Sequence, residues 1–218
     1  MRIGDGTEPV CEAVSPFAIR VLDRILAPRE WSHAELARHI FPDLAVAATQ
    51  SSQPNCPSEL LDFWKERAVL TATNAIVDEV NTNMLRELPQ ETLKTYHSVD
   101  EVDANTPDEQ ALWPVDFLNS LTPSGMPPHE LTLAPGVLVM LLRNLDADVG
   151  LCNGVRAIVV HAERRVLDVL LVSGSKAGAR AFIPRLVLAP KNPDLPFVLR
   201  RRQFPVKLAW CMTLNKAQ

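Results

Sequence analysis

The sequence predicts a mixed fold in which an α/β layer is followed by a small β-barrel. Residues 68–88 join a short apolar run to apolar residues at helical spacing, the pattern of a strand followed by a helix. Residues 130–188 hold strand-like segments separated by glycine, asparagine and proline. The chain has 218 residues, 47% of them hydrophobic and 22% charged, as in an ordinary globular protein. The longest apolar run, Val137–Leu142, is far shorter than the roughly 20 residues of a membrane span, so no membrane contact is expected.

Two short helices and a linker are predicted in the N-terminal third. Residues 15–26 start with a Ser-Pro pair that suits a helix start, although the same run could form a short strand. Ser32 and Glu35 have the spacing of a capping box, which predicts a helix over 33–40. Residues 49–58 are rich in serine, glutamine and proline and are interpreted as a linker.

The strand–helix unit at 68–88 carries the first candidate site. Residues 68–70 have the length of a strand, a polar loop follows, and the apolar helical pattern continues to Leu88. The loop contains Thr71, Thr73 and Asn74, and either of the last two suits the N-cap. Hydroxyls and free backbone amides at such a helix start can bind a phosphate, and simple N-capping explains the same residues equally well.

Shorter elements lead into the barrel. Residues 92–99 are predicted to form a strand, residues 100–112 an acidic loop, and Pro114 opens a short helix through Leu121. Five strand-like segments follow, namely ELTL, GVLVMLL, VRAIVV, RVLDVLLV and ARAFIPRLVL. Short strands at this density are typical of a small β-barrel, and residues 199–210 are expected to leave it.

The charge is distributed unevenly along the chain. Residues 1–150 carry 23 acidic and 10 basic side chains, a net charge of −13, and residues 151–218 carry 3 and 12, a net charge of +9. The two values sum to the overall −4. A basic C-terminal third suggests a surface for a polyanion, and it could equally serve as the complement of the acidic part of the same molecule.

Metal binding is not expected from the spacing of the candidate ligands. The four cysteines lie far apart without a CxxC pair, and the five histidines are scattered. No metal ligand is therefore assigned. Widely spaced cysteines are also usual in a reducing intracellular compartment.

Three motifs in fixed order resemble a known family. LNSLTPSG, VMLLRNLD and GLCNG occur in this order between residues 118 and 154. They resemble the PIF-type (petite integration frequency) DNA helicases, which are superfamily-one, 5′-to-3′ enzymes, and most closely the eukaryotic branch that includes helicases of Helitron transposons. The resemblance covers residues 60–218 densely and the first sixty loosely. It implies a nuclear or mitochondrial location.

The resemblance also implies a domain plan. It assigns 1–64 to a linker and the end of a first RecA-like region, and 65–113 to the start of a second RecA-like domain. Residues 114–190 correspond to an inserted 2B-type barrel of the Src-homology-3 kind. Residues 191–218 return to the second RecA-like domain, and LAWCMTLNKAQ is expected to stop inside a family segment that normally continues into glycine.

Catalysis by the chain alone is not expected. The family implies ATP and Mg²⁺ as cofactors of the full-length enzyme, but this sequence contains no G-x-x-x-x-G-K-[ST] phosphate-binding loop. Without that loop and the family's arginine finger, phosphoryl transfer lacks most of its electrostatic stabilisation. No catalytic residue and no cofactor are therefore assigned to this chain.

The expected role is gripping single-stranded DNA within an ATP-dependent helicase. The alternative is a non-enzymatic, transposon-derived remnant that binds nucleic acid or protein weakly. Self-association through exposed apolar surface is also expected. The candidate DNA contacts are Thr71, Thr73, Asn74, Arg143, Asn144, Asn153, Gly154, Arg200, Arg201, Arg202, Thr213, Asn215, Lys216 and Gln218.

Overall fold

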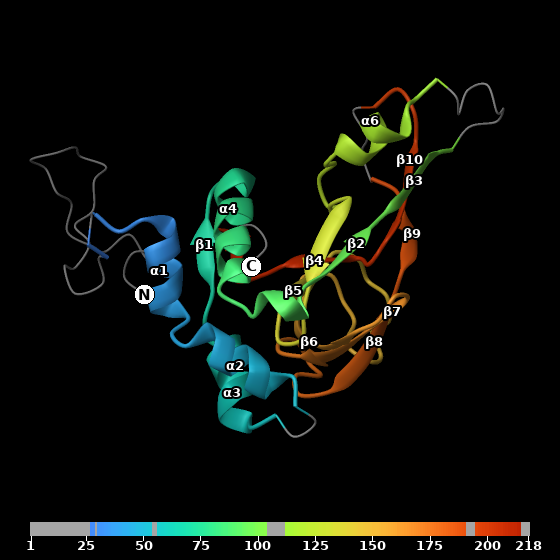
Figure 1. Ribbon diagram of the computed structural model, residues 1–218. Coiled ribbons are helices and arrows are strands. Elements are labelled where there is room, and N and C mark those ends of the chain that lie inside the picture. Colours follow the sequence, from blue (N-terminus) through green and yellow to red (C-terminus); the bar gives the residue numbers. More distant parts are fainter. Residues whose placement is uncertain (1–26, 29, 54–55, 104–111, 191–194, 215–218) are drawn as a thin grey trace, which may run out of the picture.

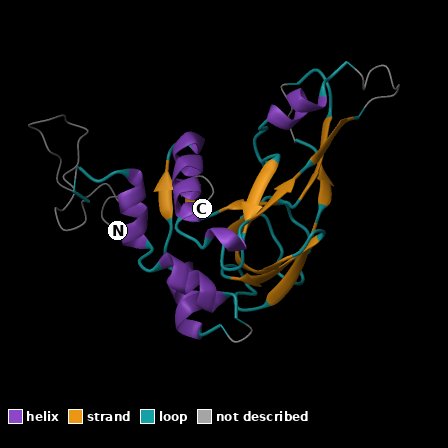
Figure 2. Cartoon of the chain, in the orientation of Figure 1, coloured by secondary structure: helices purple, strands orange, loops and turns teal. Residues whose placement is uncertain are grey.

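The helices within residues 33–86 gather on one side of the molecule and most strands on the other, and the short helix at 115–120 lies on the strand side (Figures 1 and 2). The computed structural model describes residues 27–28, 30–53, 56–103, 112–190 and 195–214. The element expected at 15–26 and three candidate DNA contacts, Asn215, Lys216 and Gln218, lie outside these ranges. The mixed α/β class that the sequence predicts is confirmed, and the sheets are mostly antiparallel.

The described helices are α1 (His33–Ile40), α2 (Leu44–Ser51), α3 (Ser58–Lys65), α4 (Asn74–Arg86), the 3₁₀ helix η2 (Gln90–Thr92) and α6 (Val115–Ser120). Three of them, α1, α4 and α6, lie where the sequence predicts a helix. In α1 the capping box is complete, because Ser32 accepts from the Glu35 amide and the Glu35 carboxylate accepts from the Ser32 amide. Helix α4 starts directly after Thr73, and α6 directly after Pro114.

The predicted linker at 49–58 is wrong at both ends. Helix α2 continues to Ser51 and α3 begins at Ser58. The two helices pack together through a buried hydrogen bond of 2.7 Å from Trp64 Nε1 to Ser51 Oγ. Helix α2 has no capping signal in the sequence, since its first turn follows Asp43 in a left-handed conformation (φ 53°) and has no side-chain cap. Packing around Trp64 stabilises its last residues, 49–51, whose polar composition favours a loop.

Within the described residues, twelve strands form four sheets. Their bounds are β1 (Val69–Thr71), β2 (Lys94–His97), β3 (Val99–Val102), β4 (Glu130–Leu133), β5 (Leu138–Leu141), β6 (Arg156–Ala162), β7 (Val166–Leu171), β8 (Arg180–Pro184), β9 (Leu186–Leu188), β10 (Leu199–Gln203), β11 (Val206–Leu208) and β12 (Cys211–Thr213). The orders are β11-β5-β6-β7-β8, β3-β10-β9, β2-β4 and β1-β12. Of the strand pairs that the structure describes, β1–β12 is the parallel one and the others are antiparallel. Among the described residues β8 and β11 are the outer strands of the five-stranded sheet, so closure into a barrel is not confirmed.

Two predictions about loops need correction. The acidic loop expected at 100–112 begins later, because β3 extends to Val102. The segment 199–210, expected to leave the barrel, instead enters the sheets. Strand β10 lies between β3 and β9, β11 pairs with β5, and β12 then pairs with β1. Residues 199–213 therefore connect three of the four sheets (Figure 1).

One hydrophobic core joins the helical side to the five-stranded sheet, and a smaller cluster surrounds Leu118 and Leu199. The contact between the two sides is close at Gly136. A Cβ built on this residue would lie 2.3 Å from the Ala48 carbonyl oxygen, so only glycine fits. No helix within the described ranges combines the length and the apolar character that crossing a membrane requires.

Candidate nucleic-acid interface

The carboxyl ends of β1 and β12 lie next to each other, beside the start of α4. Thr71 and Thr213 are directly opposite in the parallel pair, and Asn74 begins the helix three residues after Thr71. Thr73 is the N-cap residue, yet its side chain makes no capping hydrogen bond. The first amides of α4 are thus available, and a helix N-terminus of this kind attracts anions. The structure brings together the four described candidates Thr71, Thr73, Asn74 and Thr213.

A buried asparagine fixes the position of this candidate edge, which is formed by the carboxyl ends of β1 and β12 and the start of α4. The Asn81 side-chain oxygen accepts from the Cys211 amide at 2.9 Å, and its Nδ2 donates to the Cys211 carbonyl at 3.0 Å and to the Leu208 carbonyl at 3.3 Å. These bonds fix β12 against α4. Burial raises the pKa of the Cys211 thiol to about 11, so this side chain stays protonated and unreactive.

The sequence analysis did not single out Asn81, although its position carried a signal. Asn81 follows Val77 by four residues and precedes Met84 by three, and both of those residues are buried. It therefore occupies the apolar stripe of the helix. A polar side chain in such a stripe needs an internal partner, since an unpaired buried amide is costly.

The candidates at Arg143, Asn144, Asn153 and Gly154 belong to a second region, where their polar groups mainly hold the loop together. Asn144 Oδ1 accepts from the Asn153 amide at 2.7 Å, and Asn153 and Gly154 form a turn in which Gly154 has φ 88°. Arg143 donates to three backbone carbonyls, those of Gly125, Leu142 and Ala189. These contacts favour a structural role for Arg143, and contact with DNA at the other three stays a prediction.

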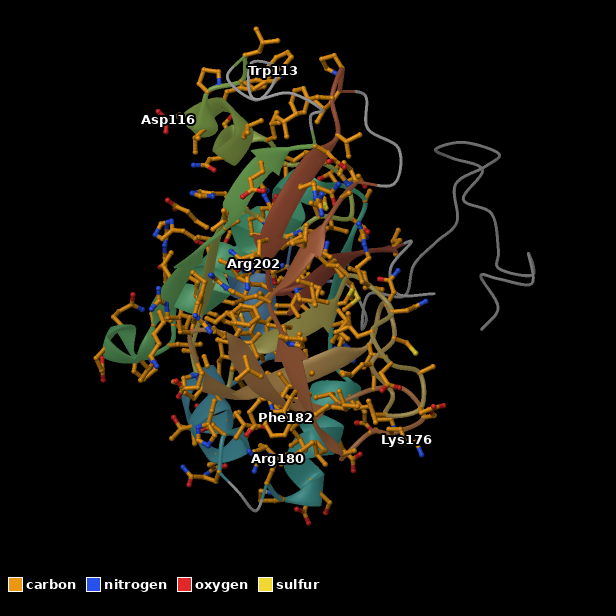
Figure 3. The ribbon with its side chains drawn as sticks, turned by 90° about the vertical axis from the view of Figure 1, so that its right-hand side faces the viewer. Trp113, Asp116, Lys176, Arg180, Phe182 and Arg202 are labelled. Atoms are coloured by element: carbon orange, nitrogen blue, oxygen red, sulfur yellow. The ribbon has the colours of Figure 1, made fainter. Side chains whose placement is uncertain are left out.

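The basic run on β10 does not form one surface. Its side chains alternate, with Arg201 fully buried and Arg200 and Arg202 exposed (Figure 3 labels Arg202). Arg201 donates through Nε and Nη2 to the Asp100 carboxylate, at 2.9 and 2.6 Å. Its remaining donors bind the carbonyls of Leu118, Leu121 and Pro127. All five N–H groups are used, so the prediction of a DNA contact at Arg201 has to be withdrawn.

Other arginines of the basic third are also bound within the protein. Arg156 donates to the carbonyls of Lys65 and Arg67 at 2.7 Å each, and burial lowers the pKa of its guanidinium. Arg180 is paired with Asp168, and the exposed Arg200 with Asp103 at 3.4 Å. Part of the positive charge therefore balances acidic groups of the same molecule. The exposed basic residues that the structure describes in this third are Arg164, Arg165, Lys176, Arg180, Arg200 and Arg202.

Fold and site together describe a mixed α/β protein with a phosphate-compatible edge, and comparison with known proteins indicates its relatives. Residues 116–161 match the family described as "DNA helicase Pif1, 2B domain". Over 142 residues the chain is 28% identical to the ATP-dependent DNA helicase PIF1 of Xenopus laevis and 32% identical to that of Danio rerio. Each alignment covers 65% of this chain and 20% of the relative.

Solved Pif1 structures are similar as well. Unliganded Pif1 from Bacteroides sp. is 22% identical, with 70% of this chain and 42% of that chain covered and a TM-score of 0.47. Pif1 helicase from Candida albicans is 19% identical, with 87% and 47% covered and a TM-score of 0.49. The 2B-domain match and the two curated relatives confirm the resemblance to PIF-type helicases. The chain spans about a fifth of the length of the curated relatives it matches.

Proposed function

We propose that this chain supplies the single-strand grip of a PIF-type, ATP-dependent 5′-to-3′ DNA helicase. In this proposal β1, α4 and β12 are part of the second RecA-like domain, and the five-stranded sheet is the inserted barrel of the Src-homology-3 kind. The observation that carries the proposal is the pairing of Thr71 with Thr213 beside the uncapped start of α4. The 2B-domain match at 116–161 supports it.

The edge is suited to hold a phosphate backbone without reading the bases. Threonine hydroxyls and helix amides are typical phosphate donors, and such contacts fix the position of a strand but carry no sequence information. Asn81 ties β12 to α4, so a strand bound across both would meet donors at a fixed spacing. ATP and Mg²⁺ would be held where the full-length family carries its phosphate-binding loop.

Removing the two paired hydroxyls should weaken binding of single-stranded DNA. In the double variant Thr71→Val and Thr213→Val the shape of each side chain is nearly kept. At about 1 kcal/mol per lost hydrogen bond, affinity should fall roughly tenfold to thirtyfold. Fluorescence anisotropy with a labelled oligonucleotide measures this. The control is Thr82→Val, an exposed position on α4, and an affinity of the double variant equal to that control would contradict the proposal.

The salt dependence separates hydroxyl contacts from charged ones. Each phosphate neutralised on a single strand contributes about −0.7 to the slope of log affinity against log salt. The threonine variants should keep the slope, because a hydroxyl releases no counterion. Arg200→Ala together with Arg202→Ala should flatten it by up to about 1.4. An unchanged slope in the arginine variant would leave these two side chains outside the DNA path.

We expect no ATP hydrolysis by this chain, with or without DNA. The sequence has no phosphate-binding loop to hold the nucleotide and orient its γ-phosphate. A coupled assay of phosphate release, with single-stranded DNA added, tests this. DNA-stimulated turnover that survives repurification would show that the chain holds nucleotide by residues not assigned here.

Exposed apolar side chains accompany the candidate edge. Leu70 on β1 is 46% exposed, and Leu214, which follows β12, is 53% exposed. In a larger RecA-like domain further elements would cover this region. Self-association through it stays a prediction.

A further inference from the structure

Two histidines and a glutamate meet at the end of the β2-β4 pair. His97 and Glu130 are directly opposite in this antiparallel register, and His129 is the residue before Glu130. One ligand atom from each of the three lies within 4.8 Å of the others. His97 Nδ1 is 3.9 Å from Glu130 Oε1. The two histidines are 32 positions apart in the chain, so their spacing gave no sign of a shared site.

The ring of His129 is oriented by a hydrogen-bonded chain. Its Nδ1 is 2.8 Å from Ser98 Oγ, and Ser98 Oγ donates to Asp100 Oδ1 at 2.7 Å. Asp100 is buried and paired with Arg201, so it accepts and does not donate. The one hydroxyl proton of Ser98 is thus used, and Nδ1 of His129 must be the donor to Ser98. The lone pair of neutral His129 therefore lies on Nε2, and this is the nitrogen that can bind a metal ion.

The backbone at this position is fixed as well. The His129 carbonyl accepts from the Ser98 amide at 2.9 Å and from Gln203 Nε2 at 3.1 Å. Gln203 also donates to the Tyr96 carbonyl at 2.8 Å. Hydrogen bonds among residues 96–98, His129 and Gln203 therefore hold the end of β2 next to the start of β4. The side chains of His97 and Glu130 are 60% and 68% exposed, which leaves them free to adjust around a bound ion.

We propose that His97, His129 and Glu130 bind a divalent transition-metal ion, with Zn²⁺ as its representative. Two imidazoles and one carboxylate suit this ion, and they leave a fourth position for water or another ligand. Zinc bonds of about 2.0–2.2 Å place neighbouring ligand atoms roughly 3.4 Å apart. The ligand atoms lie within 4.8 Å of one another, so each separation needs to close by at most about 1.4 Å, which rotation of the two exposed side chains can provide. The orientation of His129 through Ser98 and Asp100 supplies the outer hydrogen bonds usual around such sites.

Titration of the tag-free 218-residue chain with ZnCl₂ by calorimetry tests the proposal. One equivalent should bind, and at about 100 times the dissociation constant the melting temperature should rise by on the order of 5 °C. Both effects should disappear in His97→Ala and in His129→Ala, and binding should weaken in Glu130→Gln. The control is His161→Ala, an exposed histidine on β6 outside the cluster, which should bind as the original chain does.

The variants are chosen so that misfolding and loss of the site can be told apart. His97 is exposed, so His97→Ala should keep the metal-free melting temperature and circular dichroism spectrum. A Co²⁺ titration then reports the ligands, because nitrogen and oxygen donors give visible bands without a thiolate charge-transfer band. No binding by the original chain, or binding that persists in the double variant His97→Ala and His129→Ala, would overturn the proposal. Persistent binding with a thiolate band would assign the ion to the cysteines.

Discussion

Arg201→Ala is expected to lower the free energy of unfolding by about 3–5 kcal/mol, as when one partner of a buried ion pair is removed. The change leaves Asp100 charged, fully buried and without its guanidinium partner. It also leaves the carbonyls of Leu118, Leu121 and Pro127 without the donor that Arg201 supplies. Urea denaturation followed by circular dichroism measures the loss.

The neighbouring residue provides the matched control. Arg202 is on the same strand with the same side chain, but it is exposed, so Arg202→Ala should change the unfolding free energy by less than about 0.5 kcal/mol. Equal effects of the two changes would show that Arg201 is not held as the structure has it. Arg201→Lys should recover part of the loss, because an ammonium keeps the charge but cannot make the forked contact.

Gly136→Ala is the second change with a large expected effect, about 2–5 kcal/mol of destabilisation. Gly136 has φ 85°, which costs an L-residue about 1–2 kcal/mol, and the added Cβ would overlap the Ala48 backbone. Overpacking of this kind adds about 1–3 kcal/mol, and a backbone neighbour cannot rotate away. Thermal or urea unfolding of the purified variant gives the value.

Gly154→Ala separates the two contributions. Gly154 has nearly the same conformation, φ 88°, but nothing lies within 4 Å of a Cβ built there. Only the backbone strain should appear, about 1–2 kcal/mol. If both glycine variants lose the same amount, the contact between α2 and the loop before β5 is looser than the structure indicates.

Local signals explain how much of the fold the sequence could predict. The Ser32–Glu35 capping box defined α1, and the helical apolar pattern after Thr73 defined α4. Helix α2 has no such signal, since it depends on the tertiary contact between Ser51 and Trp64. The order of the strands in the sheets could not be predicted either, because it also depends on tertiary contacts. Strand segments show their own pattern, whereas the choice of partner depends on contacts far apart in the chain.

Some residues of the candidate site could likewise be predicted from local signals, and others could not. Thr71, Thr73 and Thr213 could be proposed because each follows or ends a strand, and the structure places them at one edge. Arg201 was misplaced because three consecutive arginines were interpreted as one basic surface. A strand points alternate residues to opposite faces, and the apolar Leu199 two positions earlier already marked the inward face. Its partner Asp100, 101 positions away, could not be inferred from spacing.

Because residues 199–213 complete three sheets, these sheets cannot finish folding on the ribosome until this segment has been synthesised. The ribosome releases β1, β3 and β5 first, and each then lacks a neighbour that β12, β10 or β11 will later provide. Strand β1 can pair only after another 142 residues have been synthesised, because Val69 pairs with Cys211. Open strand edges attract other chains, so the nascent protein is vulnerable to aggregation at these edges until residues 199–213 emerge. Their emergence should close all three sheets in one cooperative step, and a chaperone that shields these strand edges would be needed only before that step.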